Sequence, residues 1–192
     1  MNWTLVVEWS FFVLFILVLA YTAIVIGNEK TSYLDEAQYF LFHKLNLPIP
    51  KWWTQIKKEK TLWIFERSDT HYDWYASFEL LDFDETPIAQ LAINYLTEQK
   101  VKLDPPPEAQ IEENSSHLFK DKTLASAVSE FIRIEGTATQ DEQERIYIDL
   151  ILFKFENQIY RFKSQSSVLN GSVEGPYFEE AISLIKIKDS LD

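Results

Sequence analysis

The feature that most constrains this chain is a run of nineteen residues without a charged side chain, "WSFFVLFILVLAYTAIVIG", from Trp9 to Gly27. At 1.5 Å per residue, a helix of this length is about 28 Å long, close to the roughly 30 Å hydrocarbon thickness of a bilayer. A helix in a soluble core normally keeps a polar stripe, and a cleaved signal peptide has a basic leader and a small-residue cleavage site. The run has none of these features, and its leader carries Glu8. We therefore predict that residues 1–27 form an N-terminal tail and an uncleaved transmembrane helix.

Aromatic side chains are dense in this predicted span. The span carries more large aromatic side chains than membrane insertion alone requires, namely Trp9, Phe11, Phe12, Phe15 and Tyr21. Tryptophan and tyrosine favour the membrane–water interface, so Trp9 and Tyr21 suit positions near its two boundaries. We predict that these five residues contact the lipid bilayer or a partner protein within it.

The orientation of the predicted span stays open. No Lys or Arg precedes it, whereas Lys30 and Lys44 follow within about twenty residues, which favours a cytoplasmic domain by the positive-inside rule. Against this, short N-terminal anchors often export the domain that follows them. We expect a single-pass protein of a bacterial inner membrane, with the side of its folded domain undecided.

The charge of the chain limits the classes of partner that it can bind. The 192 residues carry a formal net charge of -12, and between Asp104 and Glu144 there are ten acidic side chains and three basic ones. Such a surface repels phosphate backbones, so we expect no nucleic-acid binding. Cysteine is absent, which excludes disulfides, thiolate metal sites and cysteine nucleophiles.

Residues 28–60 are predicted to form a juxtamembrane region of two parts. The first is a short amphipathic helix, because Ser32 and Asp35 have the spacing of a capping box and apolar residues then recur at helical spacing. This helix could lie in the membrane interface or against a membrane subunit, or it could fold back onto its own domain. Tyr33 and Phe40, on its aromatic flank, are predicted interface residues.

The second part of this region is the segment "NLPIPKWW", residues 46–53. Two prolines separated by one residue favour an extended backbone, and proline-rich ligands of adaptor domains have a similar composition. Such ligands usually lie in exposed, proline-dense tracts, whereas this segment lies between a predicted helix and a predicted strand. We predict a rigid collar that acts as a spacer, with Trp52 and Trp53 at the membrane or partner interface.

Residues 61–192 are predicted to form one α+β globular domain, an antiparallel sheet flanked by helices. Residues 61–67 and 72–83 are rich in β-branched and aromatic residues and predict a hairpin. Residues 145–164 predict a second hairpin that turns near Asn157. Apolar residues on both faces of the second hairpin indicate a central strand that is covered on each side.

Two helices and a loop complete the predicted domain. Thr86 is a good N-cap for a helix in which Pro87 takes the first position, and Pro176 opens a C-terminal helix. The proline-rich and acidic segment 105–116 predicts a long solvated loop. Residues 125–137 are ambiguous between helix and strand, and a strand is favoured.

The C-terminal part of the chain resembles PsbP-like domains. A strong hairpin, the strand "IYRFKS", a polar loop and the closing segment "PYFEEAISLIKI" follow one another as they do in that group. The similarity covers roughly the last 45 of the 192 residues and includes no diagnostic motif. It implies a PsbP-like α/β sandwich without catalytic activity that acts as an accessory subunit of a membrane assembly. The predicted anchor and collar are not part of the family's pattern.

Candidate catalytic or metal-binding groups are sparse in the sequence. The three histidines lie far apart, and none has a second ligand at helical spacing, so no zinc motif is present. Asp69, His71 and Asp73 form the one local cluster of carboxylates and imidazole, and a polar hairpin turn explains it as well. The four glycines form no phosphate-cradling loop. We predict no catalytic site, no metal site and no cofactor.

These patterns lead to a main hypothesis and two others. The main one is a membrane-anchored accessory or assembly subunit, not an enzyme, that binds other proteins of a membrane complex. The alternative is a membrane-anchored domain that binds or senses a small molecule or lipid, with a pocket lined by Trp63, Trp74, Tyr75 or Phe153. An enzyme is the third hypothesis, and it would require the cluster at Asp69–Asp73 to converge with other groups on a cleft.

Overall fold

The computed structural model describes residues 3–67 and 73–188, with side chains for all of these except 3–8 and 26–35. The chain divides into two compact units, Met1–Ala37 and Gln38–Asp192.

The N-terminal unit contains one long helix, α1 (Trp3–Glu36). The predicted helix through residues 9–27 is present, and Gly27 does not interrupt it. However, no helix in the described part of the chain is long and apolar enough to cross a membrane. The structure therefore does not support the predicted transmembrane span.

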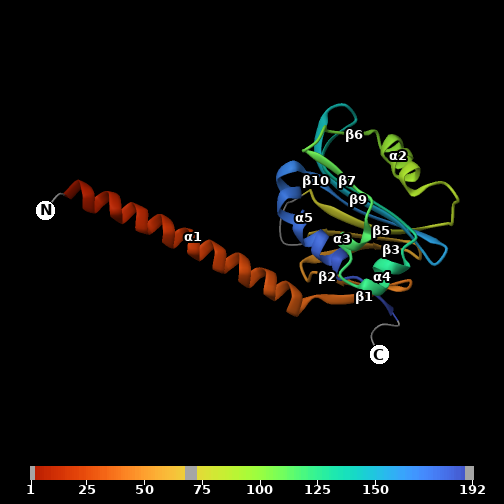
Figure 1. Ribbon diagram of the computed structural model, residues 1–192, viewed down its shortest axis with the longest axis horizontal. Helices are drawn as coiled ribbons and strands as arrows, with labels where there is room; N and C mark the ends of the chain where they lie inside the picture. The colour runs from red at the N-terminus through yellow and green to blue at the C-terminus, as the bar shows by residue number, and fades with distance from the viewer. Residues whose placement is uncertain (1–2, 68–72, 189–192) are drawn as a thin grey trace. The chain divides into compact units, whose positions relative to one another are not determined.

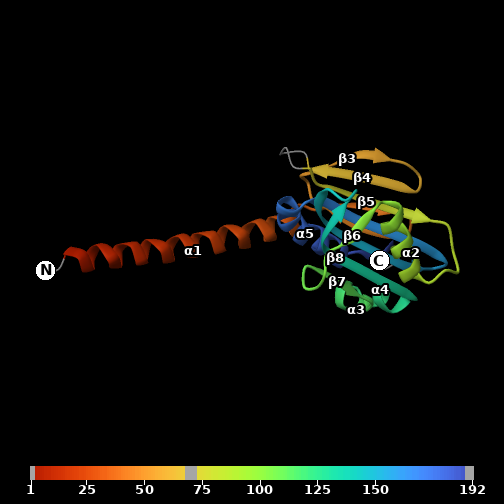
Figure 2. The same cartoon turned by 90° about the horizontal axis from the view of Figure 1, so that it is seen from above.

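The second unit is built on a large antiparallel sheet (Figure 1; Figure 2). Its strand order is β3-β4-β5-β10-β9-β8-β6, and β7 also pairs with β8, along the stretch that β6 leaves uncovered. The strands of this sheet are β3 (Trp53–Lys58), β4 (Leu62–Arg67), β5 (Tyr75–Leu81), β6 (Val101–Leu103), β7 (Ala109–Glu112), β8 (Glu130–Gln140), β9 (Glu144–Phe155) and β10 (Gln158–Ser167). A second sheet has the order β1-β2-β11 and consists of β1 (Gln38–Phe42), β2 (Leu45–Ile49) and β11 (Lys186–Ile187).

Helices flank the large sheet on both faces. One face packs against α2, and the other packs against α5 and the small sheet (Figure 1). The helices of this unit are α2 (Ile88–Glu98), α3 (Ser115–Leu118), α4 (Lys122–Ala127) and α5 (Val168–Ser183). The predicted α+β class, with antiparallel sheets and flanking helices, is confirmed for this unit.

The hairpin of β9 and β10 forms the centre of the large sheet. Its two-residue turn is Glu156–Asn157, and both residues have positive φ angles, 49° and 59°, as a tight hairpin turn of this length requires. Phe155 and Gln158 then pair directly, so the predicted hairpin and its turn are confirmed. Residues 148–155 are all buried, which fits the expectation that both faces are covered.

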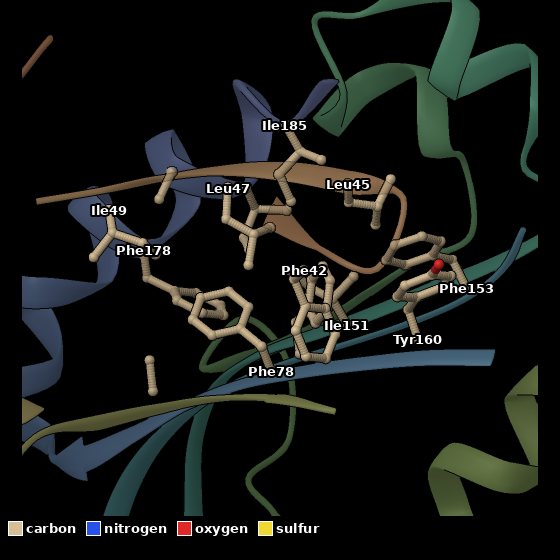
Figure 3. Close-up of a cluster of buried hydrophobic side chains, with 14 of the residues drawn as sticks. Phe42, Leu45, Leu47, Ile49, Phe78, Ile151, Phe153, Tyr160, Phe178 and Ile185 are labelled. Carbon is tan, nitrogen blue, oxygen red and sulfur yellow. The ribbon is translucent and has the colours of Figure 1, made fainter. Parts of the chain in front are cut away.

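Two hydrophobic cores result, one on each face of the large sheet. The smaller core packs Ile88, Ala92 and Leu96 of α2 against aliphatic residues of β8 and β9. The larger core is rich in aromatic residues and joins the large sheet to the small sheet and α5 (Figure 3). Its central members, labelled in Figure 3, are Phe42, Leu45, Leu47, Ile49, Phe78, Ile151, Phe153, Tyr160, Phe178 and Ile185.

The predicted juxtamembrane amphipathic helix is wrong over residues 38–45. The chain leaves α1 at Glu36 and forms the β1–β2 hairpin, which turns at His43–Lys44 with a positive φ of 55° at His43. Phe42 and the β2 residues Leu45, Leu47 and Ile49 are at most 1% exposed. Burial of these side chains in the larger core outweighs the weak helical preference of the segment, because propensity differences are small.

The predicted collar at residues 46–53 also has a different role. Leu47, Pro48 and Ile49 lie in β2, and all three are buried. The segment is therefore an integral part of the domain and not a spacer. The domain begins at Gln38, whereas the sequence pattern placed its start at residue 61.

Three smaller differences concern the second half of the chain. Segment 105–116, predicted as a loop, contains β7 and the start of α3. Residues 125–137 divide between the end of α4 and most of β8, so the favoured strand is correct only from Glu130. Helix α5 begins at Val168, well before Pro176, and Pro176 lies inside it.

Helix α5 approaches the large sheet closely through a glycine. A Cβ atom at Gly171 would lie 2.3 Å from Cβ and Cγ of Tyr147, and one at Gly175 would lie 3.0 Å from the Tyr147 hydroxyl. Tyr147 is part of β9, so its ring cannot easily move away. Glycine at position 171 therefore sets the distance between helix and sheet.

We predict that Gly171→Ala destabilises the protein by about 1–3 kcal/mol, because the added methyl group overpacks this contact. In an unconstrained helix the same change stabilises by roughly 0.5–1 kcal/mol. The sign of the change in unfolding free energy, measured by urea titration, is thus diagnostic. Leu169→Ala, at a position in the same helix that is 80% exposed, is the control and should change stability by less than about 0.5 kcal/mol. A stabilised Gly171→Ala variant would contradict the packing.

Candidate functional site: the apolar surface of helix α1

The described part of α1 presents an apolar surface on all sides. Each large hydrophobic side chain between Trp9 and Ile24 is between 48% and 70% exposed. Nine of them, Phe11–Leu19, are consecutive, and nine residues make more than two full turns at 3.6 residues per turn. The helix therefore has no polar face in this region, unlike a helix that covers the core of a soluble domain.

One polar group on this surface is bonded within the helix itself. The Thr22 hydroxyl donates a hydrogen bond of 2.8 Å to the Val18 carbonyl oxygen, one turn earlier. Trp9 packs edge-to-face on Phe12, with ring centroids 5.9 Å apart. A threonine bonded back to its own helix can enter an apolar environment at little cost. The chemistry that this surface supports is the burial of apolar area, at about 25 cal/mol per Å².

The other predicted interface residues lie elsewhere. The side chain of Tyr33 is outside the described residues. Phe40 packs on Trp63 and Phe65, with centroids 6.4 and 6.1 Å apart, and Trp52 packs on Tyr177 at 5.1 Å. Their predicted interface role is untested, but all of these contacts are made within the domain.

Trp53 is 5% exposed and belongs to a buried polar group that the sequence pattern did not indicate. Its indole N–H donates a hydrogen bond of 3.1 Å to the carboxylate of Glu174, which also accepts from the Arg67 guanidinium. Glu174 lies on α5 and is fully buried. The three residues tie β3 and β4 to α5. Because Glu174 is followed by Gly175 and Pro176, the local sequence suggested a loop and hid this contact.

A second buried ion pair lies beneath α5. Arg133 of β8 donates to both carboxylate oxygens of Asp149 on β9, over 3.1 and 2.8 Å, and Asp149 is completely buried. Glu135 and Glu179 also lie within 4 Å of Arg133. Burial raises the pKa of Asp149 to about 6, although Arg133 opposes the shift. Burial by itself would lower the pKa of the Arg133 guanidinium, but the attraction of nearby carboxylates, mainly Asp149, is larger, so the pKa is raised.

The predicted Asp69–Asp73 cluster is only partly described. Asp69 and His71 lie outside the described residues. The carboxylate of Asp73 accepts hydrogen bonds from the backbone N–H of Ser167, its hydroxyl and the Asn170 amide. Asp73 therefore holds the first turn of α5, which explains why this helix starts so early. Among the residues with described side chains, no group of three or more potential metal ligands occurs.

The residues proposed for a ligand pocket mostly fill the domain core. Trp63, Trp74 and Phe153 belong to the larger core and are at most 7% exposed. The Trp74 indole N–H donates to the Ser164 hydroxyl over 2.8 Å, so its polar atom is satisfied inside the domain. Tyr75 points to the opposite face of the sheet, as its alternation with Trp74 requires.

Several solved structures are similar to this fold. The cyanobacterial PsbP of Synechocystis, CyanoP, aligns with a TM-score of 0.51 and 8% identity over 78% of this chain and 91% of that protein. A protein from Bacteroides thetaiotaomicron aligns with a TM-score of 0.50 and 10% identity over 79% of this chain and 48% of its own length. The present chain thus spans about half of that protein. The Ran-binding protein Mog1p of Saccharomyces cerevisiae aligns with a TM-score of 0.48 and 8% identity, over 81% and 97% of the two chains.

These similarities concern the fold. The alignment with CyanoP confirms the expected PsbP-like fold and extends it from the C-terminal segment to most of the chain. At this level of identity it carries no information on activity or partners. No family model and no curated protein matches the chain.

We predict strong coupling between Arg67 and Glu174. Replacing Arg67 by Met should destabilise the protein by about 3–5 kcal/mol, because it leaves the fully buried Glu174 carboxylate without its cationic partner. Glu174→Met should cost less, because the Arg67 side chain is 17% exposed. The double variant should recover much of this loss, since both charges are gone. Urea unfolding of the wild type, the two single variants and the double variant gives the coupling energy. Additive effects of the two substitutions would contradict a buried pair.

The pH dependence of Asp149 provides a separate prediction. A carboxyl group with a raised pKa in the folded state favours folding most when it is protonated. Its contribution is full below the ordinary pKa of 3.8 and is lost as pH rises through about 6. Relative to Asp149→Asn, which cannot titrate, the wild type should therefore lose roughly 2–3 kcal/mol of stability between pH 3.5 and pH 7. Carbon-13 titration of the Asp149 carboxyl should give a midpoint near 6; a midpoint below 4 would refute the assignment.

Proposed function

We propose that this protein is a membrane-anchored accessory or assembly subunit whose PsbP-like domain binds other proteins of a membrane complex. The observation that carries the proposal is the apolar surface of α1, exposed around the whole helix between Trp9 and Ile24. A surface of this kind in water is unfavourable and marks a site that lipid or protein covers.

Lipid is the occupant of α1 that we favour. A partner protein would normally cover one stripe of a helix, whereas α1 is apolar all round. Lipid chains surround a helix completely and demand no polar face. The charge-free run from Trp9 to Gly27 supports this choice, and so does the internal hydrogen bond of Thr22. Because no described helix meets the requirements of a span, membrane insertion needs a direct test.

A protein partner for the folded domain is supported by an exposed stripe on α5. Leu169, Ser172, Val173 and Pro176 are all exposed, at the helical spacing of one face. Leu169 is 80% exposed, although leucine is usually buried in the structures of single domains. We call these four residues the α5 stripe. A formal net charge of -12 further suits a partner with a basic surface.

Membrane insertion predicts that the full chain floats with phospholipid vesicles and resists extraction at alkaline pH. Replacing Leu14 and Leu17 together by Arg should release it, because a charge at the centre of a bilayer costs about 2.5–3.5 kcal/mol per residue. Leu169→Arg, a matched change at an exposed leucine of the domain, should leave flotation intact. Wild-type protein that stays in the aqueous fraction would refute the anchor.

Partner binding predicts that the protein, purified from its native membrane in mild detergent, migrates in an assembly larger than its own 22.6 kDa mass and detergent micelle. Leu169→Asp with Val173→Asp should release a monomer from this assembly, since charges on the α5 stripe disfavour an apolar contact. Ile93→Asp, at an exposed apolar position of α2, should have no effect. A wild-type monomer under these conditions would argue against the subunit role.

A further inference from the structure

A buried lysine lies on the face of the large sheet that α2 covers in part. Lys163 of β10 is only 5% exposed. Its ammonium group donates hydrogen bonds to the Tyr75 hydroxyl over 2.7 Å and to the Gln165 side-chain oxygen over 3.2 Å. Tyr75 itself donates to Gln165 over 3.0 Å, and the Gln165 amide donates to Gln140 over 2.8 Å. The partners of Lys163 are therefore neutral groups that are also bonded to one another.

The carboxylate that acts on this lysine is already engaged. Glu79 of β5 accepts two hydrogen bonds from Arg161, over 3.1 and 2.5 Å. Arg161 and Lys163 are two positions apart on β10, so both point to the same face of the sheet. Among the described residues, no carboxylate lies within ion-pair distance of Lys163. Glu79 is thus paired with Arg161, and among the described residues Lys163 has no carboxylate partner of its own.

Two aromatic rings lie against these cations. The Arg161 guanidinium lies 4.0 Å from the ring centroid of Tyr95 on α2. The Lys163 ammonium lies 4.8 Å from the Tyr75 ring and 5.6 Å from the Tyr95 ring. Burial, and to a smaller extent the charge of Arg161, lowers the pKa of Lys163 to about 8, although Glu79 opposes the shift. Cation–π contacts lessen the penalty of burying these charges but do not neutralise them.

We propose that Lys163, Tyr75 and Arg161 form a binding site for a small ligand with a carboxylate or phosphate group, which supplies the missing negative charge. An ammonium group has three N–H donors, and two of those of Lys163 have protein acceptors. A carboxylate or phosphate oxygen can take the third, in a charge-assisted hydrogen bond. The Tyr75 and Tyr95 rings would contact the apolar part of such a ligand.

A purely structural role explains the lysine less well. If this position only had to fill space beneath α2, an uncharged chain of similar length would do so without a desolvation penalty. The α2 side of the sheet offers such residues at nearby positions, for example Ile159 on the same strand and Leu150 opposite Lys163. A buried charge without a protein counterion is the pattern expected at a binding site.

The test uses the full chain in a non-ionic detergent at pH 7, with sodium phosphate and sodium acetate as probes. Sodium chloride at equal ionic strength provides the reference. We expect one of the two probes to raise the unfolding temperature of the wild type by several degrees more than chloride, because a ligand that binds only the folded state stabilises it. The Lys163→Met variant should lose this rise. Lys102→Met, at an exposed lysine on β6, should keep it.

The response also identifies the ligand group. A rise with phosphate alone assigns a phosphate site, and a rise with acetate alone assigns a carboxylate site. No rise beyond chloride with either probe overturns the proposal, and so does an equal rise in wild type and Lys163→Met. Lys163→Met should fold, since Tyr75 and Gln165 keep their mutual hydrogen bond.

A second measurement does not depend on any variant. Nitrogen-15 titration of the Lys163 ammonium in the wild type should show a pKa near 8 in chloride. The bound anion stabilises the charged form, so the effective probe should raise this pKa by at least one unit. A pKa that neither phosphate nor acetate changes would overturn the anion site. Both readouts are independent of membrane insertion, so failure of the anchor and failure of this site can be told apart.

Discussion

The β9–β10 hairpin is the element on which the rest of the domain depends. A tight turn at Glu156–Asn157 fixes its register, and burial of residues 148–155 requires that both faces be covered. Helix α2 covers one face with aliphatic side chains, and α5 with the small sheet covers the other with aromatic ones. The β1–β2 hairpin belongs to this cover, which is why a segment that follows the long helix directly is part of the folded core.

The buried charges on this framework differ in how they are compensated. Arg133 and Asp149 pair within the large sheet, where Glu179 of α5 also contacts Arg133, and Arg67 of β4 pairs with Glu174 of α5. Buried ion pairs stabilise a fold weakly, but they disfavour alternative packings because each charge needs its partner. Lys163 differs, because its protein partners are neutral. The first two cases are explained by the architecture of the domain, whereas the third indicates a ligand that the domain itself does not provide.

The sequence predicted those parts of the fold whose signals are local. Runs of β-branched and aromatic residues identified the β9–β10 and β4–β5 hairpins. The pair Thr86–Pro87 placed the start of α2 to within one residue, although Pro87 and not Thr86 is its N-cap. The β1–β2 hairpin was missed because its apolar residues fit helical spacing as well as strand alternation, and only burial in a distant core decides between them. The first half of α5 was missed for a similar reason. Two glycines and several serines suggest a loop there, and the helix depends on Asp73 and on Tyr147, far away in the chain.

The candidate site on α1 was predictable from composition, since a charge-free apolar run is visible in any window of that length. The central claim of the proposed function is that this run lies in a lipid bilayer. Because the chain has no cysteine, one introduced cysteine can be labelled specifically to test it. A spin label attached to Leu17→Cys, in full-length protein reconstituted with phospholipid vesicles, reports whether oxygen or a water-soluble nickel chelate reaches the middle of the apolar run. Insertion predicts strong relaxation by oxygen and little by the chelate, with the opposite pattern for a label at Leu169→Cys on α5. Equal access of the chelate to both positions would show that α1 stays in water and would contradict the account.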